Sequence, residues 1–398
     1  MTRVVFLDNI RYLMIVFVVI YHSVAAYATV VPWWPYHDNS FFGADILREF
    51  LDVFIMPVLF FVSGYFALPS VEKKGVWEFL KDKGRRLLIP WVLGVLVVFP
   101  LLLYDQAGQS VRPFWNYWLS YLGGFPIQLS LLPRDVSQGP YWFLSLLFAL
   151  FALFALVRTA THRWRSKTVL SAARKELSGR SMLVALALFG VLTSAGYFVS
   201  LLFFPDTSWL TLSMFLEFQP ARLVLFVGYF ALGVYAQSHG WFAGGKPLGC
   251  VASWGTISAI LAVAFVIAGK PLYANLAGTP NLPVELLLAF AFVRSFLLVS
   301  LLVVFVSVGV RYWNRSSGFD RQLSEASYNI YLTHFWFVLI IQASLLSWGG
   351  PALAKPVIVF LLALAVSFVI SRWVIGRYPR ASAAVILALF VFCLVVRP

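Results

Sequence analysis

The stretch that decides the fold is residues 285–310, which read ELLLAFAFVRSFLLVSLLVVFVSVGV. Its only charged side chains are Glu285 at the start and Arg294. About 20 consecutive apolar residues are enough for a helix to cross the hydrocarbon core of a bilayer. The stretch therefore predicts a transmembrane helix.

Runs of the same kind recur along the whole chain. We expect spans at 12–31, 47–68, 87–104, 140–158, 181–203, 220–237, 250–268, 285–310, 326–348, 354–372 and 381–397. The last run, or the one at 220–237, could instead be re-entrant or interfacial, which would leave ten. The predicted fold is an all-α integral membrane protein, a polytopic bundle of about 10–11 transmembrane helices. Residues 1–398 are expected to form a single domain, since no connection is large enough for a separate soluble one.

The composition excludes the soluble classes of protein. The chain is 61% hydrophobic and 12% charged, whereas a soluble domain carries about 25% charged residues. A soluble globule, a disordered tail, a coiled coil and a disulfide scaffold are all excluded. Cys250 and Cys393 both lie in apolar stretches and show neither a disulfide framework nor metal-ligand spacing, so no metal is expected.

The basic residues indicate an orientation in the membrane. With a cytoplasmic N-terminus, 22 of the 30 Lys and Arg residues fall in the inside segments 1–11, 73–86, 158–180, 238–249, 311–321 and 372–380. Such an excess is typical of cytoplasmic loops. The net charge of +14 is therefore read as a topology signal and not as a nucleic-acid site.

The first run has no small-residue cleavage site after it and is expected to remain in the mature protein. The connection 105–139, rich in Trp, Tyr, Pro and Gly, is expected to fold over the outer surface.

The first helix carries three side chains that a membrane span rarely tolerates. Asp8, Arg11 and His22 fall near one stripe of a continuous helix, because eleven residues at 100° complete about three turns. His22 would then lie about 16 Å from Arg11 along the helix axis, near mid-membrane. An imidazole can take and return a proton near neutral pH. The alternative is that His22 only forms a hydrogen bond to a neighbouring helix.

A second histidine stripe occurs late in the chain. Ser327, Tyr331 and His334 recur at i, i+4 and i+7 and therefore share a helical face. With a cytoplasmic start, His334 would lie about 12 Å into the span, at a depth similar to that of His22. The two stripes could line one cavity. Alternatively, the hydroxyl groups form a polar seam between helices.

The third feature is the basic segment Lys81–Arg86, just before the span at 87–104. Arg85 and Arg86 could bind phosphate through their planar, bidentate donors. The alternative is ordinary positive-inside anchoring. Three further charged residues, Arg294 in mid-span and Glu217 and Arg222 near the outer surface, could form structural pairs or contact a polar acceptor.

Five motifs, in this order, resemble the membrane acyltransferase-3 family. They are the spacing of Arg11 and His22 after Leu7-Asp8, then Met56–Tyr65 (MPVLFFVSGY), Arg85–Pro90 (RRLLIP), Tyr141–Leu144 (YWFL) and Ser327–His334 (SYNIYLTH). The segments Phe6–His22 and Ser63–Phe66 look most like the branch that includes the glucan-modifying succinyltransferase of bacterial envelopes.

The resemblance implies a bacterial inner-membrane enzyme of about ten helices. Such enzymes move acetyl, succinyl or similar groups from cytoplasmic acyl-CoA to a hydroxyl of an envelope carbohydrate, lipid or related acceptor. The family's important His and Arg fall on His22 and Arg11, and its basic pair falls on Arg85 and Arg86. Its late Ser-Tyr motif falls on Ser327 and Tyr328.

These observations together predict an O-acyltransferase whose site opens to the cytoplasm. His22 is expected to act as a general base or as a transient acyl carrier. Arg11, with Asp8, is expected to position the donor or stabilise the oxyanion. The residues expected to bind acyl-CoA, either acetyl-CoA or succinyl-CoA, are Arg85, Arg86, Ser327, Tyr328 and His334.

The competing functional class is a proton-coupled transporter or flippase of an envelope precursor, which buried Arg294, His22 and His334 would also suit. The oligomeric state stays open.

Overall fold

The computed structural model describes residues 4–30, 34–104, 113–124, 127–130, 138–164, 179–242, 245–273, 282–315 and 317–396. These residues are almost entirely helical. The long helices are α1 (Val5–Ser23), α2 (Phe42–Lys74), α3 (Val76–Leu93), α6 (Trp142–Trp164), α7 (Gly179–Phe203), α8 (Leu223–Ser238), α9 (Val251–Tyr273), α10 (Val284–Tyr312), α11 (Gly318–Leu345), α12 (Ala354–Val369) and α13 (Pro379–Val396).

Each expected apolar run overlaps a helix of the described chain, although several bounds differ. Among these residues, eight helical stretches are long and apolar enough to cross a membrane. The predicted class, an all-α polytopic membrane protein, is confirmed. α8 and α13 are shorter apolar helices, and the 16 residues of α8 extend over about 24 Å.

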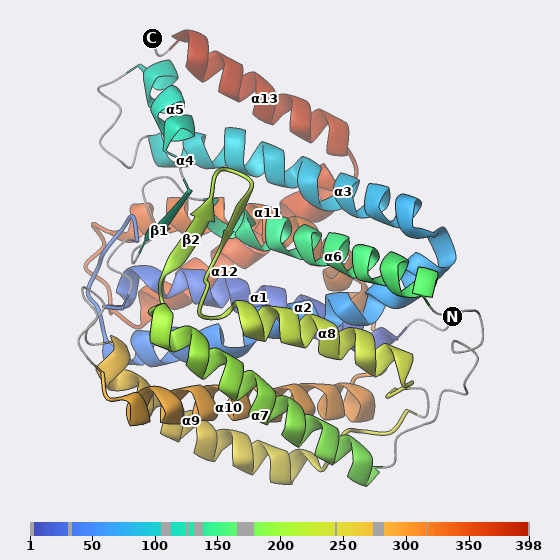
Figure 1. Cartoon of the computed structure of the whole chain (residues 1–398). Helices are drawn as coiled ribbons and strands as arrows, with labels where there is room; N and C mark the ends of the chain where they lie inside the picture. Colours follow the sequence, from blue (N-terminus) through green and yellow to red (C-terminus); the bar gives the residue numbers. More distant parts are fainter. Residues whose placement is uncertain are drawn as a thin grey trace.

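Figure 1 shows the helices running across the view, with the N-terminus at the right and a small sheet toward the left. α1 and α2 lie in the middle of the bundle, α13 runs along its upper edge, and α7 and α9 form its lower edge. α1 contacts α2, α10, α11 and α12. The first helix, which carries Asp8, Arg11 and His22, is therefore surrounded by other helices.

The boundaries of α1 differ from the expected span at 12–31. The helix begins at Val5, because Phe6, Leu7 and Ile10 are already buried in the core. It ends at Ser23 and is followed by a short 3₁₀ turn, η1 (Ala25–Tyr27). The amide of Gln342 in α11 donates hydrogen bonds to the backbone carbonyls of His22 and Ser23. These bonds satisfy carbonyls that the helix end leaves without intrahelical partners.

α2 and α8 pack so closely that two glycines are required between them. A Cβ atom on Gly64 of α2 would lie 2.0 Å from the carbonyl oxygen of Phe230 in α8. A Cβ on Gly233 of α8 would lie 2.1 Å from the carbonyl oxygen of Phe61. Small residues at helix contacts let backbones approach in a membrane, where van der Waals packing drives helix association. Gly64 belongs to one of the five motifs, so this motif has a packing role.

The third span contains a π-helical turn, η2 (Gly94–Val98), which continues into α4 (Phe99–Tyr104). A π turn disturbs the regular i→i−4 ladder and is frequently found at functional sites. Side chains of α5 (Phe114–Gly123) bond to its carbonyls, with Tyr121 donating to Val95 and Trp118 to Leu96. A second π turn, η5 (Ile370–Ile375), follows α12.

A three-stranded antiparallel sheet, which the sequence analysis did not predict, lies at one end of the bundle. Its order is β1 (Ile127–Ser130), β2 (Trp209–Leu212) and β3 (Leu216–Phe218). The backbone N–H of Gln138 donates to Glu217 of β3 at 2.5 Å, and the indole of Trp91 in α3 donates to the Gln138 side chain at 2.9 Å. The hairpin β2–β3 is thus tied to the third span. Residues 105–112, 125–126 and 131–137 of the connection expected to cover the outer surface lie outside the described chain.

Candidate active site

His22 of α1 and His334 of α11 are in direct contact. Nδ1 of His22 lies 3.0 Å from Nε2 of His334, a hydrogen-bond distance. His334 is completely buried, whereas His22 keeps some accessible surface. The expectation that both histidines lie at similar depth therefore holds, and the two rings touch instead of facing each other across a space.

Aromatic rings enclose this histidine pair. Trp34, in the segment after α1, stacks on His22 with ring centroids 5.7 Å apart and planes 18° from parallel. Phe335 of α11 meets His22 edge-on at 5.3 Å. Stacking and edge-to-face contacts restrict how the His22 ring can turn. The histidine pair is therefore enclosed by aromatic side chains.

Gln342 connects Trp34 to the C-terminal end of α1. Its side-chain oxygen accepts a hydrogen bond from the indole N–H of Trp34 at 2.8 Å. Its amide N–H groups donate to the carbonyls of His22 and Ser23 at 3.1 and 3.2 Å. The sequence analysis missed Trp34 and Gln342. Gln342 could have been noticed as the one amide within the apolar run Phe335–Leu346.

Arg11 lies on the same helix contact, nearer the N-terminal end. Its guanidinium is 3.2 Å from the Asp8 carboxylate and donates to the Ser324 hydroxyl of α11 at 3.3 Å. The next residue, Tyr12, donates to Asp320 at 2.5 Å. Asp320 also closes a capping box with Ser317, which explains why α11 begins before the expected start of the span at residue 326. We call the part of the structure that contains Arg11, Asp320 and the α3 residues Lys83, Arg85 and Arg86 the basic end.

The late Ser-Tyr motif joins α11 to the basic segment of α3. The hydroxyl of Tyr328 donates to the backbone carbonyl of Arg86. The Arg86 guanidinium lies 3.2 Å from Asp82 and is largely exposed, as is Arg85. Ser327 bonds to the Ser324 carbonyl of its own helix at 2.8 Å. The structure thus brings Tyr328 to the basic pair, while the Ser327 hydroxyl is used within α11.

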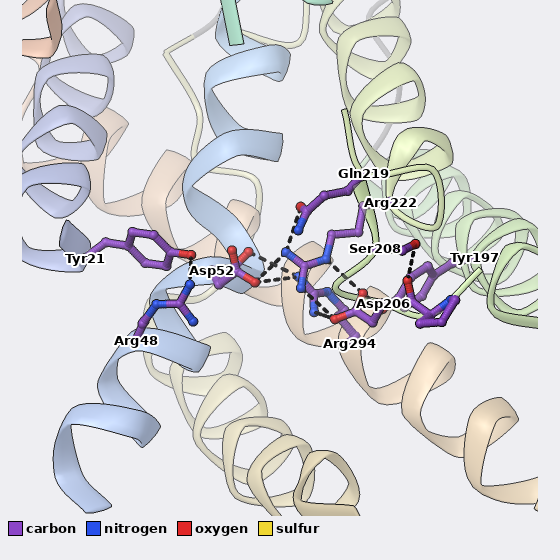
Figure 2. A network of polar contacts seen from close by, with 10 residues as sticks. Tyr21, Arg48, Asp52, Tyr197, Asp206, Ser208, Gln219, Arg222 and Arg294 are labelled. Carbon is purple, nitrogen blue, oxygen red and sulfur yellow. Dashed lines mark hydrogen bonds and ion pairs between the residues drawn. The ribbon is translucent and has the colours of Figure 1, made fainter. Parts of the chain in front are cut away.

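Asp52, Asp206, Arg222 and Arg294 form a largely buried ion network (Figure 2). Arg222 lies 2.5 Å from Asp52 and 2.6 Å from Asp206, and Arg294 lies 3.1 Å from Asp206. Of the two roles left open for Arg222 and Arg294, these contacts favour structural pairing. Asp52 and Asp206 were not recognised from the sequence.

The ion network lowers the pKa of Asp206, which lies in the loop between α7 and β2. Burial alone would raise the pKa of its carboxyl group, but the charges of Arg222 and Arg294 outweigh burial. Together with a hydrogen bond from Tyr197, they hold the pKa of Asp206 well below its ordinary value. Asp206 therefore stays ionised at every ordinary assay pH.

A family model described as "Acyltransferase domain" matches residues 4–375. The chain belongs to this acyltransferase family. The match covers all the residues that form the histidine pair and the basic end. No curated protein and no solved structure matches the chain.

Membership decides between the two functional classes considered from the sequence. The protein is a multi-pass membrane acyltransferase, and the transporter alternative is set aside. The acyltransferase contains no group of three or more His, Cys, Asp or Glu residues able to hold a metal ion within its described part.

Proposed function

We propose that this acyltransferase moves a short acyl group, such as acetyl or succinyl, from cytoplasmic acyl-CoA to a hydroxyl of an envelope carbohydrate or related acceptor. Its place would be the inner membrane of a bacterium, with the basic end facing the cytoplasm. The observation that carries the proposal is the contact between His22 and His334 at 3.0 Å, on the same pair of helices that join Arg11 to Ser324.

The basic end suits a CoA thioester. Arg85 and Arg86 are exposed there, where they can approach the phosphate groups. Lys83 lies between two rings of the same region, with its ammonium 4.5 Å from the ring of Phe151 and 5.5 Å from that of Phe79. These cations would hold the nucleotide part of CoA while its pantetheine arm extends between α1 and α11 toward His22.

Arg11 is better placed to position the donor than to stabilise the oxyanion at His22. Eleven residues of continuous helix separate the two residues by about 16 Å along the axis. The Arg11 side chain is 40% exposed, and Asp8 and Ser324 hold its guanidinium. It would therefore contact the donor near the mouth of the site. Of the two roles expected for Arg11 from the sequence, we therefore favour donor positioning over oxyanion stabilisation.

His22 would act as the general base of the transfer. Its free ring nitrogen takes the proton of the acceptor hydroxyl while the hydroxyl oxygen attacks the thioester carbonyl. The new C–O bond forms, the C–S bond breaks, and the proton passes from His22 to the departing CoA thiolate. In the acyl-carrier alternative, the same nitrogen attacks the carbonyl first and CoA leaves before the acceptor arrives.

Purified protein in proteoliposomes, supplied with acyl-CoA labelled in the acyl group, tests the proposal. We expect free CoA to appear together with labelled, ester-linked acceptor. Envelope glycans from a deletion strain, compared by mass spectrometry with those of the parent, would identify the acceptor as the species that loses the acyl group. A thioester that stays intact with every acceptor fraction and every short acyl-CoA would overturn the proposal.

A further inference from the structure

The hydrogen bonds of His334 fix which of its ring nitrogens carries hydrogen. Nδ1 lies 2.7 Å from the backbone carbonyl of Tyr331 and 3.2 Å from that of Ile330. Carbonyl oxygens only accept hydrogen bonds, so Nδ1 of His334 must be the protonated nitrogen. In the neutral ring, Nε2 of His334 is then left as an acceptor.

This acceptor in turn fixes the tautomer of His22. Nε2 of His334 lies 3.0 Å from Nδ1 of His22, and a hydrogen bond between them requires the hydrogen on Nδ1 of His22. A neutral His22 then carries a lone pair on Nε2. Within the described chain, the His22 ring bonds to His334 and to the backbone carbonyl of Val18, one turn earlier on α1, and the side chain keeps accessible surface.

The neutral form of His334 is the one that its surroundings favour. The side chain is 0% exposed, and its contacts within the described chain are carbonyl oxygens and aromatic rings. No carboxylate of the described chain lies against it to balance a positive charge. A buried charge without a partner is strongly disfavoured. The direction of the bond, from His22 to His334, follows.

We propose that His334 is a positioning residue that holds His22 in the tautomer with a bare Nε2, so that Nε2 is the nitrogen that reacts. The inference rests on the proposed function for the identity of the reaction, and on the contacts above for the tautomer. When Nε2 takes a proton, Nδ1 still donates to His334. The bond therefore persists through the step and orients the ring at every stage. This role differs from the donor-binding role expected for His334 from the sequence.

Two substitutions at His334 separate positioning from simple packing. His334→Gln places an amide oxygen near the position of Nε2 and keeps an acceptor for His22. His334→Phe keeps the ring and removes the acceptor. We expect His334→Phe to lower kcat by about 100-fold, with KM for acyl-CoA changed less than about threefold. We expect His334→Gln to recover most of kcat. His239→Gln, at a half-buried histidine bonded to Ser238 and Tyr235, is the control and should match wild type.

A measurement that needs no activity tests the tautomer itself. Ring ¹⁵N spectra of the purified chain, which has five histidines, can be assigned by comparison with His22→Gln protein. We expect hydrogen on Nδ1 and none on Nε2 of His22, with the preference weakened in His334→Phe, where only the Val18 carbonyl remains to accept from the ring. A spectrum showing hydrogen on Nε2 of His22 in the wild type would overturn the inference. So would equal kcat for both His334 variants. Failure of the proposed function is distinct, since it would leave acyl-CoA unconsumed by the wild type.

Discussion

The hydroxyl of Tyr328 in α11 donates a hydrogen bond to the backbone carbonyl of Arg86 in α3. The two residues are 242 positions apart in sequence and belong to two of the five motifs. The bond therefore connects the proposed donor-binding segment to the helix that carries His334.

Tyr328→Phe tests this connection. Removing the hydroxyl takes away one hydrogen bond, worth about 1 kcal/mol, and frees the turn that carries Arg86. We expect KM for acyl-CoA to rise about fivefold, with a smaller change in kcat. Steady-state kinetics with varied acyl-CoA measure both parameters. An unchanged KM would show that the bond only joins the helices.

Arg86→Gln tests the phosphate contact directly. A charge-assisted hydrogen bond to phosphate contributes about 1.5 kcal/mol, so we expect KM for acyl-CoA to rise about tenfold. The matched control is Arg377→Gln, which removes an equal charge from another exposed arginine that stacks on Tyr378. Equal effects of both substitutions would indicate general electrostatic attraction. A tenfold effect of Arg86→Gln alone would support a specific contact.

Gly64→Ala tests the close packing of α2 and α8. The added Cβ would lie 2.0 Å from the Phe230 carbonyl oxygen, so the helices must separate. We expect a loss of about 2 kcal/mol of stability, seen as a lower Tm in detergent. Gly255→Ala in α9 is the control, because nothing lies within 4 Å of its added Cβ. A Tm for Gly64→Ala equal to that of the control would contradict the packing described.

Asp206→Asn tests the buried ion network of Figure 2. Removing one partner from a buried pair costs about 3 kcal/mol, so we expect a clearly lower Tm. Because folding lowers the pKa of Asp206 from 3.8, its stabilising effect is complete above that value and is lost as the pH falls through the lower, folded pKa. The Tm difference from wild type should be constant from about pH 5 to pH 8 and shrink only below about pH 4. A difference that fades near neutral pH would contradict the assignment.

The sequence was sufficient to predict the helices, because a bilayer demands apolar runs of a fixed length. It was also sufficient to place Arg11 and His22 on one side of α1, since helical periodicity sets that relation. It did not show that His22 and His334 touch, because that distance depends on how α1 and α11 pack. For the same reason Asp206 was missed as the partner of Arg222. The small sheet was missed because its strands are only three or four residues long.

His22→Ala gives the most direct test of the central claim, that one accessible imidazole held against His334 performs the transfer. The measurement is the rate at which purified protein in proteoliposomes releases CoA from acyl-CoA and acylates the acceptor, with acyl-CoA binding measured in parallel. We expect the rate to fall by about 1,000-fold while acyl-CoA binding stays within about threefold of wild type. Transfer by His22→Ala at the wild-type rate would contradict the account.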